Sequence, residues 1–233
     1  MHLFKYIPSQ YLKSFLGGAV RFQALSFFQR YENQIAIGDA FEAMRLFRPT
    51  GGLEINNLTT GQTFTLPGAF LSSALAERIF VFCASKTLSQ SLAQEFRSDA
   101  CVEISDFEAF LSKLQIAVAA QPGSNVLLHG AVSYYQDADP PGVNWALPDA
   151  IIMSKRDFYR RQCEYRFAFA EREVLDVGRT AQRLVTGAVQ PTHSNRGAAP
   201  RELAVGDIRS ISVVYRCLPN EGMHPAAQKP GGG

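Results

Sequence analysis

The alternation of residue types between Gln162 and Phe169 is the feature of this sequence that points most directly to chemistry. The segment QCEYRFAF is typical of a strand, in which successive side chains point to opposite faces of the sheet. Gln162, Glu164 and Arg166 therefore share one face. A carboxylate on such a face can accept a hydrogen bond from a ribose 2′-hydroxyl and stabilise positive charge developing at the anomeric carbon. A Gln two residues earlier can orient an incoming acceptor.

This polar face has two interpretations, and the sequence leaves both open. It is either a solvent-exposed sheet face or the wall of a polar cleft. In both, Cys163 shares the opposite, apolar face with Tyr165 and Phe167, which predicts a packed thiol and not a nucleophile. A polar-facing Glu164 is also expected to tolerate substitution without unfolding of the protein.

Other familiar catalytic signatures are absent from the sequence. The four cysteines and four histidines are scattered, with no CxxC or HExxH, so neither a disulfide framework nor a metal site is predicted. GxxxxGK[ST], GxGxxG and GxSxG are missing as well. These absences argue against zinc, P-loop and serine-hydrolase chemistry.

Basic residues gather in the segment SKRDFYRRQCEYR, although the net charge of the chain is only +2. Arg160, Arg161 and Arg166 lie here among aromatic side chains, an arrangement that can bind phosphates or nucleic acid. A solvated helix face explains the same pattern.

The order of the expected strands and helices that position these residues indicates an α+β fold, with a mixed or antiparallel sheet and flanking helices. Helices are expected after Ser9, from Ser89 to Phe96 and from Phe107 onward. A hairpin is expected within residues 53–66 around Thr60-Gly61. The remaining predicted strands are Leu3–Ile7, Ala19–Gln23, Ile79–Ala84, Val102–Ile104, Val126–Tyr135, Tyr165–Phe169 and Ile208–Tyr215.

Composition sets the broad class of the protein. The chain has 233 residues, 46% hydrophobic and 19% charged, which is typical of a globular protein. We expect one domain over residues 1–218 and a disordered Gly/Pro-rich tail over residues 219–233. No apolar run reaches the roughly 20 residues needed to cross a bilayer, and no signal peptide is predicted, so a cytoplasmic protein without membrane association is expected.

The order of short motifs along residues 1–170 resembles that of the ADP-ribosyltransferase superfamily. It is most similar to uncharacterised bacterial domains of this kind that are linked to toxin and phage-defence systems. The motifs that carry the resemblance are Lys5-Tyr6, Gly17-Gly18, Arg21-Phe22, Gly38-Asp39-Ala40-Phe41-Glu42, Cys83-Ala84-Ser85 and Gln162–Arg166.

The resemblance implies NAD as cofactor, departure of nicotinamide from the ribose, and no metal. It makes Glu164 the catalytic carboxylate, with Gln162 beside it. Tyr6 is then expected to wall the nicotinamide pocket, and Arg21 or Lys5 to neutralise the pyrophosphate. Ser26 and Tyr31 are further cofactor-binding candidates, while Arg160, Arg161 and Arg166 are candidates for binding the acceptor.

Three functions follow as hypotheses. The first is transfer of ADP-ribose to a nucleic acid (RNA or DNA) or a protein, which Gln162 favours because it can place an acceptor. The second is hydrolysis of NAD by a toxin, which implies a neutralising antitoxin partner. The third is a non-enzymatic nucleic-acid- or protein-binding module. The first two require the Leu3–Ile7 strand and the strand carrying Glu164 to lie in one sheet system and line a common cleft.

Overall fold

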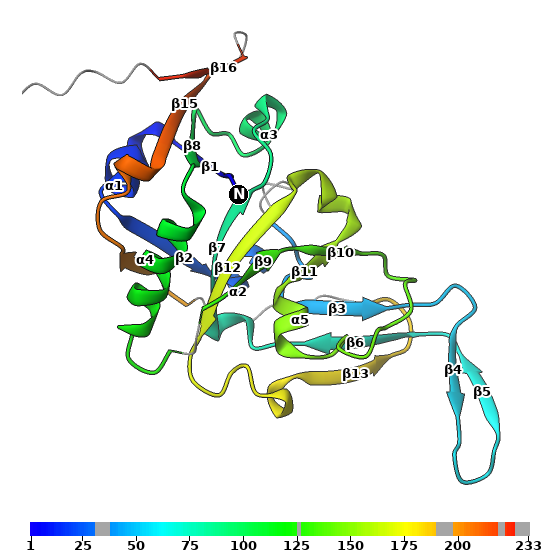
Figure 1. The fold of residues 1–233 in the computed structure, drawn as a ribbon. Helices are drawn as coiled ribbons and strands as arrows, with labels where there is room; N and C mark the ends of the chain where they lie inside the picture. Colours follow the sequence, from blue (N-terminus) through cyan, green and yellow to red (C-terminus); the bar gives the residue numbers. More distant parts are fainter. Residues whose placement is uncertain (31–37, 125–126, 190–197, 219–221, 227–233) are drawn as a thin grey trace, which may run out of the picture.

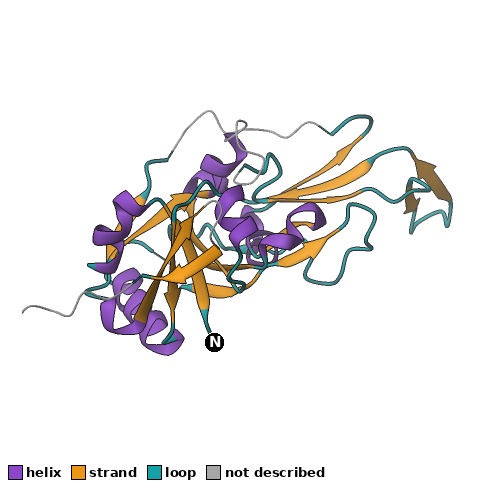
Figure 2. Ribbon diagram, turned by 90° about the horizontal axis from the view of Figure 1, so that it is seen from above, coloured by secondary structure: helices purple, strands orange, loops and turns teal. Residues whose placement is uncertain are grey.

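A computed structural model describes residues 1–30, 38–124, 127–189, 198–218 and 222–226 of the chain. The fold is α+β, with mostly antiparallel sheets and few helices, as predicted (Figures 1 and 2). The strands are β1 Leu3–Ile7, β2 Ala19–Ala24, β3 Met44–Phe47, β4 Leu53–Asn56, β5 Thr63–Leu66, β6 Ala69–Ser73, β7 Ile79–Ser85, β8 Ala100–Ile104, β9 Leu128–Ala131, β10 Ser133–Tyr135, β11 Ser154–Arg156, β12 Glu164–Ala170, β13 Ala181–Val185, β14 Arg201–Ala204, β15 Ser212–Leu218 and β16 Gly222–Pro225.

The helices are short, apart from one. The α-helices are α1 Leu12–Leu16, α2 Leu25–Arg30, α3 Gln90–Glu95, α4 Phe107–Ala119 and α5 Pro148–Ile152, and the 3₁₀ helices are η1 Ser9–Tyr11, η2 Ala76–Arg78, η3 Asp157–Gln162, η4 Val177–Arg179 and η5 Arg209–Ile211. Asp106 begins α4, because its side chain accepts a hydrogen bond from the backbone N–H of Ala109. In the sequence, Ser105 and Asp106 both suit this capping position, and the structure uses Asp106.

A nine-stranded sheet holds the fold together, with the order β14-β2-β7-β1-β8-β15-β16 and with β12 pairing to both β7 and β9. All of its strand pairs are antiparallel. The predicted strands β1, β2, β7, β8 and β12 lie side by side at its centre. Residues near both ends of the described chain therefore contribute to one sheet.

Strand β7 is the point at which this sheet branches. One edge of β7 pairs with β12 along its whole length, from Ile79 to Ser85. The other edge is shared, because β1 pairs with it only at Ser85 and β2 only at Phe80 and Val81. Between these pairings β1 and β2 diverge, and Lys5 Nζ hydrogen-bonds the carbonyl oxygen of Cys83, 2.7 Å away. The divergence of β1 and β2 leaves a space beside β7 that no strand fills.

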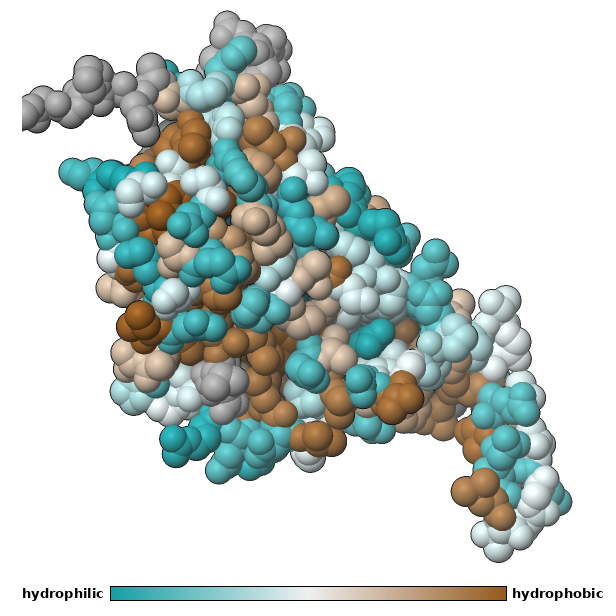
Figure 3. All heavy atoms as spheres, in the orientation of Figure 1, coloured by the Kyte–Doolittle hydropathy of each residue, from teal (hydrophilic) through white to brown (hydrophobic). Residues whose placement is uncertain are grey.

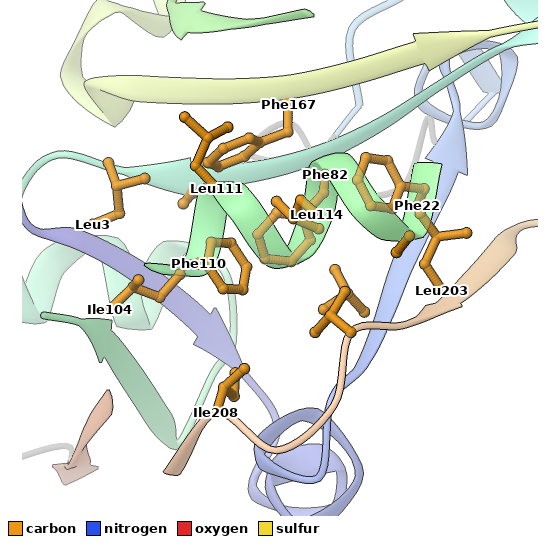
Figure 4. Close-up of a cluster of buried hydrophobic side chains, with 14 of the residues drawn as sticks. Leu3, Phe22, Phe82, Ile104, Phe110, Leu111, Leu114, Phe167, Leu203 and Ile208 are labelled. Atoms are coloured by element: carbon orange, nitrogen blue, oxygen red, sulfur yellow. The ribbon is translucent and has the colours of Figure 1, made fainter. Parts of the chain in front are cut away.

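The opposite face of the sheet carries the main hydrophobic core, against which α4 packs (Figure 4). Phe110 and Leu114 of α4 are fully buried, and they meet Phe82 of β7 and Phe167 of β12. The three- and four-residue spacing of apolar residues in α4 places them on the one side that faces the sheet. The side of each central strand that faces α4 is therefore the apolar side.

A smaller sheet, β13-β6-β3, lies beside the large one and continues into the β4–β5 hairpin (Figures 1 and 2). The hairpin extends away from the rest of the molecule and carries apolar surface (Figure 3). Ile55 and Phe64, which are cross-strand partners, and Leu58 are exposed. The predicted hairpin is thus present, but it packs little of its apolar surface.

Three sequence-based predictions of elements need correction. The single strand predicted over Val126–Tyr135 is two strands, β9 and β10, in different sheets, and residues 125–126 lie outside the described ones. The strand predicted to begin at Ile208 begins at Ser212, after η5. Part of the tail predicted to be disordered forms β16, which pairs with β15.

Within the described residues, no helix combines the length and the apolar character that crossing a membrane requires.

Gly18 provides a test of the turn between α1 and β2. It has a φ of 96°, and an added Cβ would overlap the backbone of Gly206. We expect Gly18→Ala to lower the free energy of unfolding by at least about 1–2 kcal/mol, because an L-residue resists this conformation and the neighbour is backbone. Gly142→Ala is the control, since a Cβ there meets nothing within 4 Å. Denaturant unfolding of both variants measures the difference, and equal stabilities would contradict the expectation.

Candidate functional site

A cavity of about 400 Å³ lies where β1 and β2 diverge along β7. It is lined by residues from four strands of the large sheet together with side chains that follow α3 and end η3. Six of the residues singled out from the sequence line it: Lys5, Tyr6, Arg21, Gln162, Glu164 and Arg166. The expectation that β1 and the strand carrying Glu164 share one sheet and one cleft is confirmed.

Side-chain alternation explains why these residues face the cavity. On β12, Tyr165 and Phe167 enter the main core, and Glu164 and Arg166, which alternate with them, point to the other face. On β2, Phe22 enters the core and its neighbour Arg21 lines the cavity. The predicted division of β12 into an aromatic and a polar face is therefore correct from Glu164 onward.

The same alternation does not extend to Gln162 and Cys163, which is a correction. Strand β12 begins at Glu164, and Gln162 is the last residue of η3. Cys163 ends that helix in a left-handed conformation, with a φ of 44°. Its thiol contacts the carbonyl oxygen of Arg160 at 3.7 Å and is not packed among Tyr165 and Phe167. Gln162 still lines the cavity, but from the end of a helix.

The polar face of β12 is buried, so its interpretation as a solvent-exposed sheet face is wrong. Glu164 is 5% exposed and Arg166 is 1% exposed. Arg166 Nε donates to Glu164 Oε1 at 2.8 Å, and its Nη1 donates to Glu42 Oε1 at 2.7 Å. Arg166 also donates to the carbonyl oxygen of Ile152. Its guanidinium is held inside the protein by these partners, so its position does not support the predicted role in binding the acceptor.

Lys155 completes a network of two cations and two carboxylates. Its Nζ donates to Glu164 Oε2 at 3.1 Å and to Gln162 Oε1 at 3.0 Å, and lies 4.5 Å from the centre of the Tyr159 ring. The backbone N–H of Glu164 donates to Tyr134 Oη. Glu164 is thus fixed from several sides, and its burial with these partners overturns the basis for expecting it to tolerate substitution.

The charge of Glu164 is set by these neighbours. Burial by itself raises the pKa of the carboxyl group, but Arg166 and Lys155 outweigh it and hold the pKa well below its usual value. Glu164 is therefore ionised at neutral pH and is no general acid. Arg166, Lys155 and the thiol of Cys83 each donate a hydrogen bond to this carboxylate, so one of its four lone-pair sites is left for a hydroxyl group.

Lys5 and Tyr6 form the β1 side of the cavity. Lys5 Nζ lies 4.5 Å from the centre of the Phe82 ring, and burial lowers the pKa of this amine. Tyr6 Oη donates to the carbonyl oxygen of Thr87 and accepts from the N–H of Ser89, both at 2.7 Å. Its phenol is therefore occupied, and burial raises its pKa. Tyr6 contributes a rigid aromatic wall.

The other predicted cofactor-binding residues differ in position. Arg21 is an exposed residue at the cavity and forms no ion pair with any described residue. Ser26 is fully buried in α2 and does not line the cavity, so its predicted role is not supported by its position. Tyr31 lies outside the described residues.

Arg160 and Arg161 lie on η3 outside the cavity and are exposed. Arg160 pairs with Asp157, and Arg161 forms two hydrogen bonds with Glu95, of 2.9 and 2.8 Å. The segment is a 3₁₀ helix with much of its charge compensated, and not a continuous basic face.

Sequence reasoning did not assign three charged residues that line the cavity: Glu42, Lys155 and Arg97. Glu42 belongs to the GDAFE motif and Lys155 to the basic segment, so both carried a signal. Nothing in the sequence distinguishes Arg97. No group of three or more potential metal ligands occurs among the described residues.

No family model matches the chain, and no curated protein or solved structure matches it either.

Asp39, next to this network, predicts a pH dependence of stability. Burial, and then the charge of Glu42, raise its pKa to about 6. The folded protein therefore binds the proton more tightly than the unfolded chain, and this site lowers stability as the pH rises from about 4 to about 6.

Asp39→Asn removes the buried charge and keeps an oxygen that can accept the N–H of Phe41, as Asp39 does now. At pH 8 we expect the variant to be more stable than wild type by about 1–3 kcal/mol, with the gain vanishing near pH 4. Urea unfolding at a series of pH values measures this difference. A constant difference across the series would contradict the assignment.

Proposed function

We propose that the protein binds NAD in this cavity and transfers its ADP-ribose to a macromolecular acceptor, with an ADP-ribosyltransferase-like arrangement of the sheet. The supporting observation is that Lys5, Tyr6, Arg21, Gln162 and Glu164, which are far apart in the sequence, line one cavity. The motif resemblance assigns Lys5, Tyr6 and Arg21 to NAD binding, and Glu164 and Gln162 to catalysis.

The chemistry of the cavity agrees with reaction at a ribose. Glu164 stays ionised, so it can accept a hydrogen bond from the ribose 2′-hydroxyl and stabilise positive charge at the anomeric carbon. The bond from that carbon to nicotinamide breaks, and nicotinamide leaves as a neutral molecule. The acceptor then bonds to the same carbon and loses its proton. Lys155 and Arg166 partly offset the charge of Glu164. The stabilisation of positive charge at the anomeric carbon therefore depends strongly on how close Glu164 lies to the ribose.

The size and lining of the cavity also suit such a ligand. A volume of about 400 Å³ lies within the roughly 300–1,000 Å³ that is usual for small-molecule sites. Phe4, Tyr6 and Phe96 give it aromatic walls against which a ring can pack. Lys5 and Arg21 supply positive charge for the pyrophosphate.

Hydrolysis of NAD is a second candidate function, favoured by the position of Gln162. This residue is 3% exposed, and its Oε1 accepts from Lys155 Nζ. A large acceptor has little access to a buried side chain, whereas water does. A toxin of this kind would act in the bacterial cytoplasm and require an antitoxin partner.

Glu164→Gln tests the catalytic assignment. We expect nicotinamide release to fall on the order of 10²–10³-fold, because the preorganised negative charge is lost. We also expect the variant to lose about 3–5 kcal/mol of stability, because Arg166 and Lys155 lose a buried partner. Nicotinamide release from NAD should therefore be measured by chromatography at a temperature where circular dichroism shows both proteins folded.

Glu42→Gln is the matched control, since it removes a carboxylate with the same partner, Arg166, and similar burial. It should lose comparable stability with a much smaller loss of activity. Equal activity losses in the two folded variants would make Glu164 a structural residue and defeat the proposal.

Labelled NAD incubated with cell extract distinguishes the products. Label in the protein or nucleic-acid fraction supports transfer, whereas free ADP-ribose alone supports hydrolysis. If neither product forms, only the third hypothesis remains, that of a non-enzymatic binding module.

If nucleic acid is the acceptor, replacing Arg160 and Arg161 with Ala should weaken binding and reduce the log–log salt slope by roughly one unit per lost phosphate contact. Their present partners, Asp157 and Glu95, would have to be exchanged for phosphates. Replacing Arg172 and Arg179 with Ala removes the same charge away from the cavity and serves as the control. An unchanged slope would assign Arg160 and Arg161 to the solvated surface.

A further inference from the structure

Positive charge that is not compensated gathers on one side of the cavity. Of its charged lining residues, Lys155 and Arg166 are paired with Glu164 and Glu42. The remaining three are basic: Lys5, Arg21 and Arg97. Lys5 donates to the carbonyl oxygen of Cys83, burial lowers its pKa, and the charge of Glu164 acts on it as well. Arg21 and Arg97, in contrast, are exposed and form no ion pair with any described residue. Such an arrangement favours an anion that carries more than one charge.

Arg97 occupies a backbone position that favours glycine. It follows α3, where its N–H donates to the carbonyl oxygen of Gln94 and the N–H of Ser98 donates to that of Ala93. Its φ is 51°, in the left-handed region that commonly ends a helix at Gly. An arginine there costs stability, and its guanidinium is exposed at the cavity with no partner among the described residues to offset that cost. Strain of this kind is often retained at binding sites.

We propose that Arg97 and Arg21 together bind the diphosphate of a nucleotide ligand, with Arg97 as a second phosphate-binding arm. This inference rests on the proposed function, which it deepens by assigning a residue and a ligand class, the diphosphate-linked nucleosides. The two guanidiniums come from separate elements, the end of α3 and strand β2, so they can contact different phosphate oxygens. Charge-assisted hydrogen bonds from arginine to phosphate are strong and geometrically specific.

Arg97→Gly is the most informative variant, because it removes the guanidinium and relieves the backbone at once. We expect its Tm to rise by about 2 °C or more. We expect its affinity for ADP, ADP-ribose and NAD to fall roughly 10- to 100-fold in calorimetric titrations. Affinity for nicotinamide and adenosine, which lack phosphate, should not change. A merely structural residue would not produce higher stability with weaker binding of diphosphates alone.

Two controls separate the effects. Glu173 also has a positive φ, of 69°, and does not line the cavity, so Glu173→Gly should raise the Tm without changing affinity. Arg172→Ala removes one exposed positive charge elsewhere and should leave affinity unchanged. In a double-mutant cycle, Arg21→Ala and Arg97→Gly should be non-additive if both side chains bind one diphosphate.

The outcomes distinguish this inference from the proposed function. If wild type binds ADP and Arg97→Gly binds it equally well, the role of Arg97 is overturned while the proposed function stands. If ADP binding depends on Arg97 but NAD is not cleaved, the proposed function fails and the diphosphate site remains. If wild type binds neither ADP nor inorganic pyrophosphate, the inference is overturned.

Discussion

The buried guanidinium of Arg166 is the interaction on which the organisation of the site depends. It connects Glu164 on its own strand with Glu42, which precedes β3, and with the carbonyl oxygen of Ile152 at the end of α5. A charge this deeply buried is tolerated only with partners of opposite charge and good geometry. The large sheet, the smaller sheet and α5 are therefore held in one arrangement at this point, and Glu164 is fixed with them.

This network gives the cavity two electrically different sides. Around β12, two cations and two carboxylates compensate one another, and the pKa of Glu164 stays low because its partners outweigh burial. Around β2 and the end of α3, Arg21 and Arg97 line the cavity and form no ion pair with any described residue. In the function proposed above, the phosphates of the nucleotide lie toward this second side and the ribose lies toward Glu164.

The branching of the sheet at β7 creates the space between these sides. Because β1 and β2 pair with the same edge of β7 at different ends, the backbone groups between them need other partners. The amine of Lys5 satisfies the carbonyl oxygen of Cys83, so a side chain takes the place of a strand. One residue thus stabilises the branch and also lines the cavity.

The sequence by itself determined the α+β class, the central strands and the aromatic face of β12, because these depend on local periodicity. The motif resemblance also named Lys5, Tyr6, Arg21, Gln162 and Glu164, which line one cavity in the structure. Only the tertiary structure decided that the polar face of β12 is buried, that Arg166 pairs with Glu42 far along the chain, and that Gln162 ends a helix. Burial and long-range ion pairing arise from how elements pack, and Arg97 reaches the cavity for the same reason, without any local pattern that marks it.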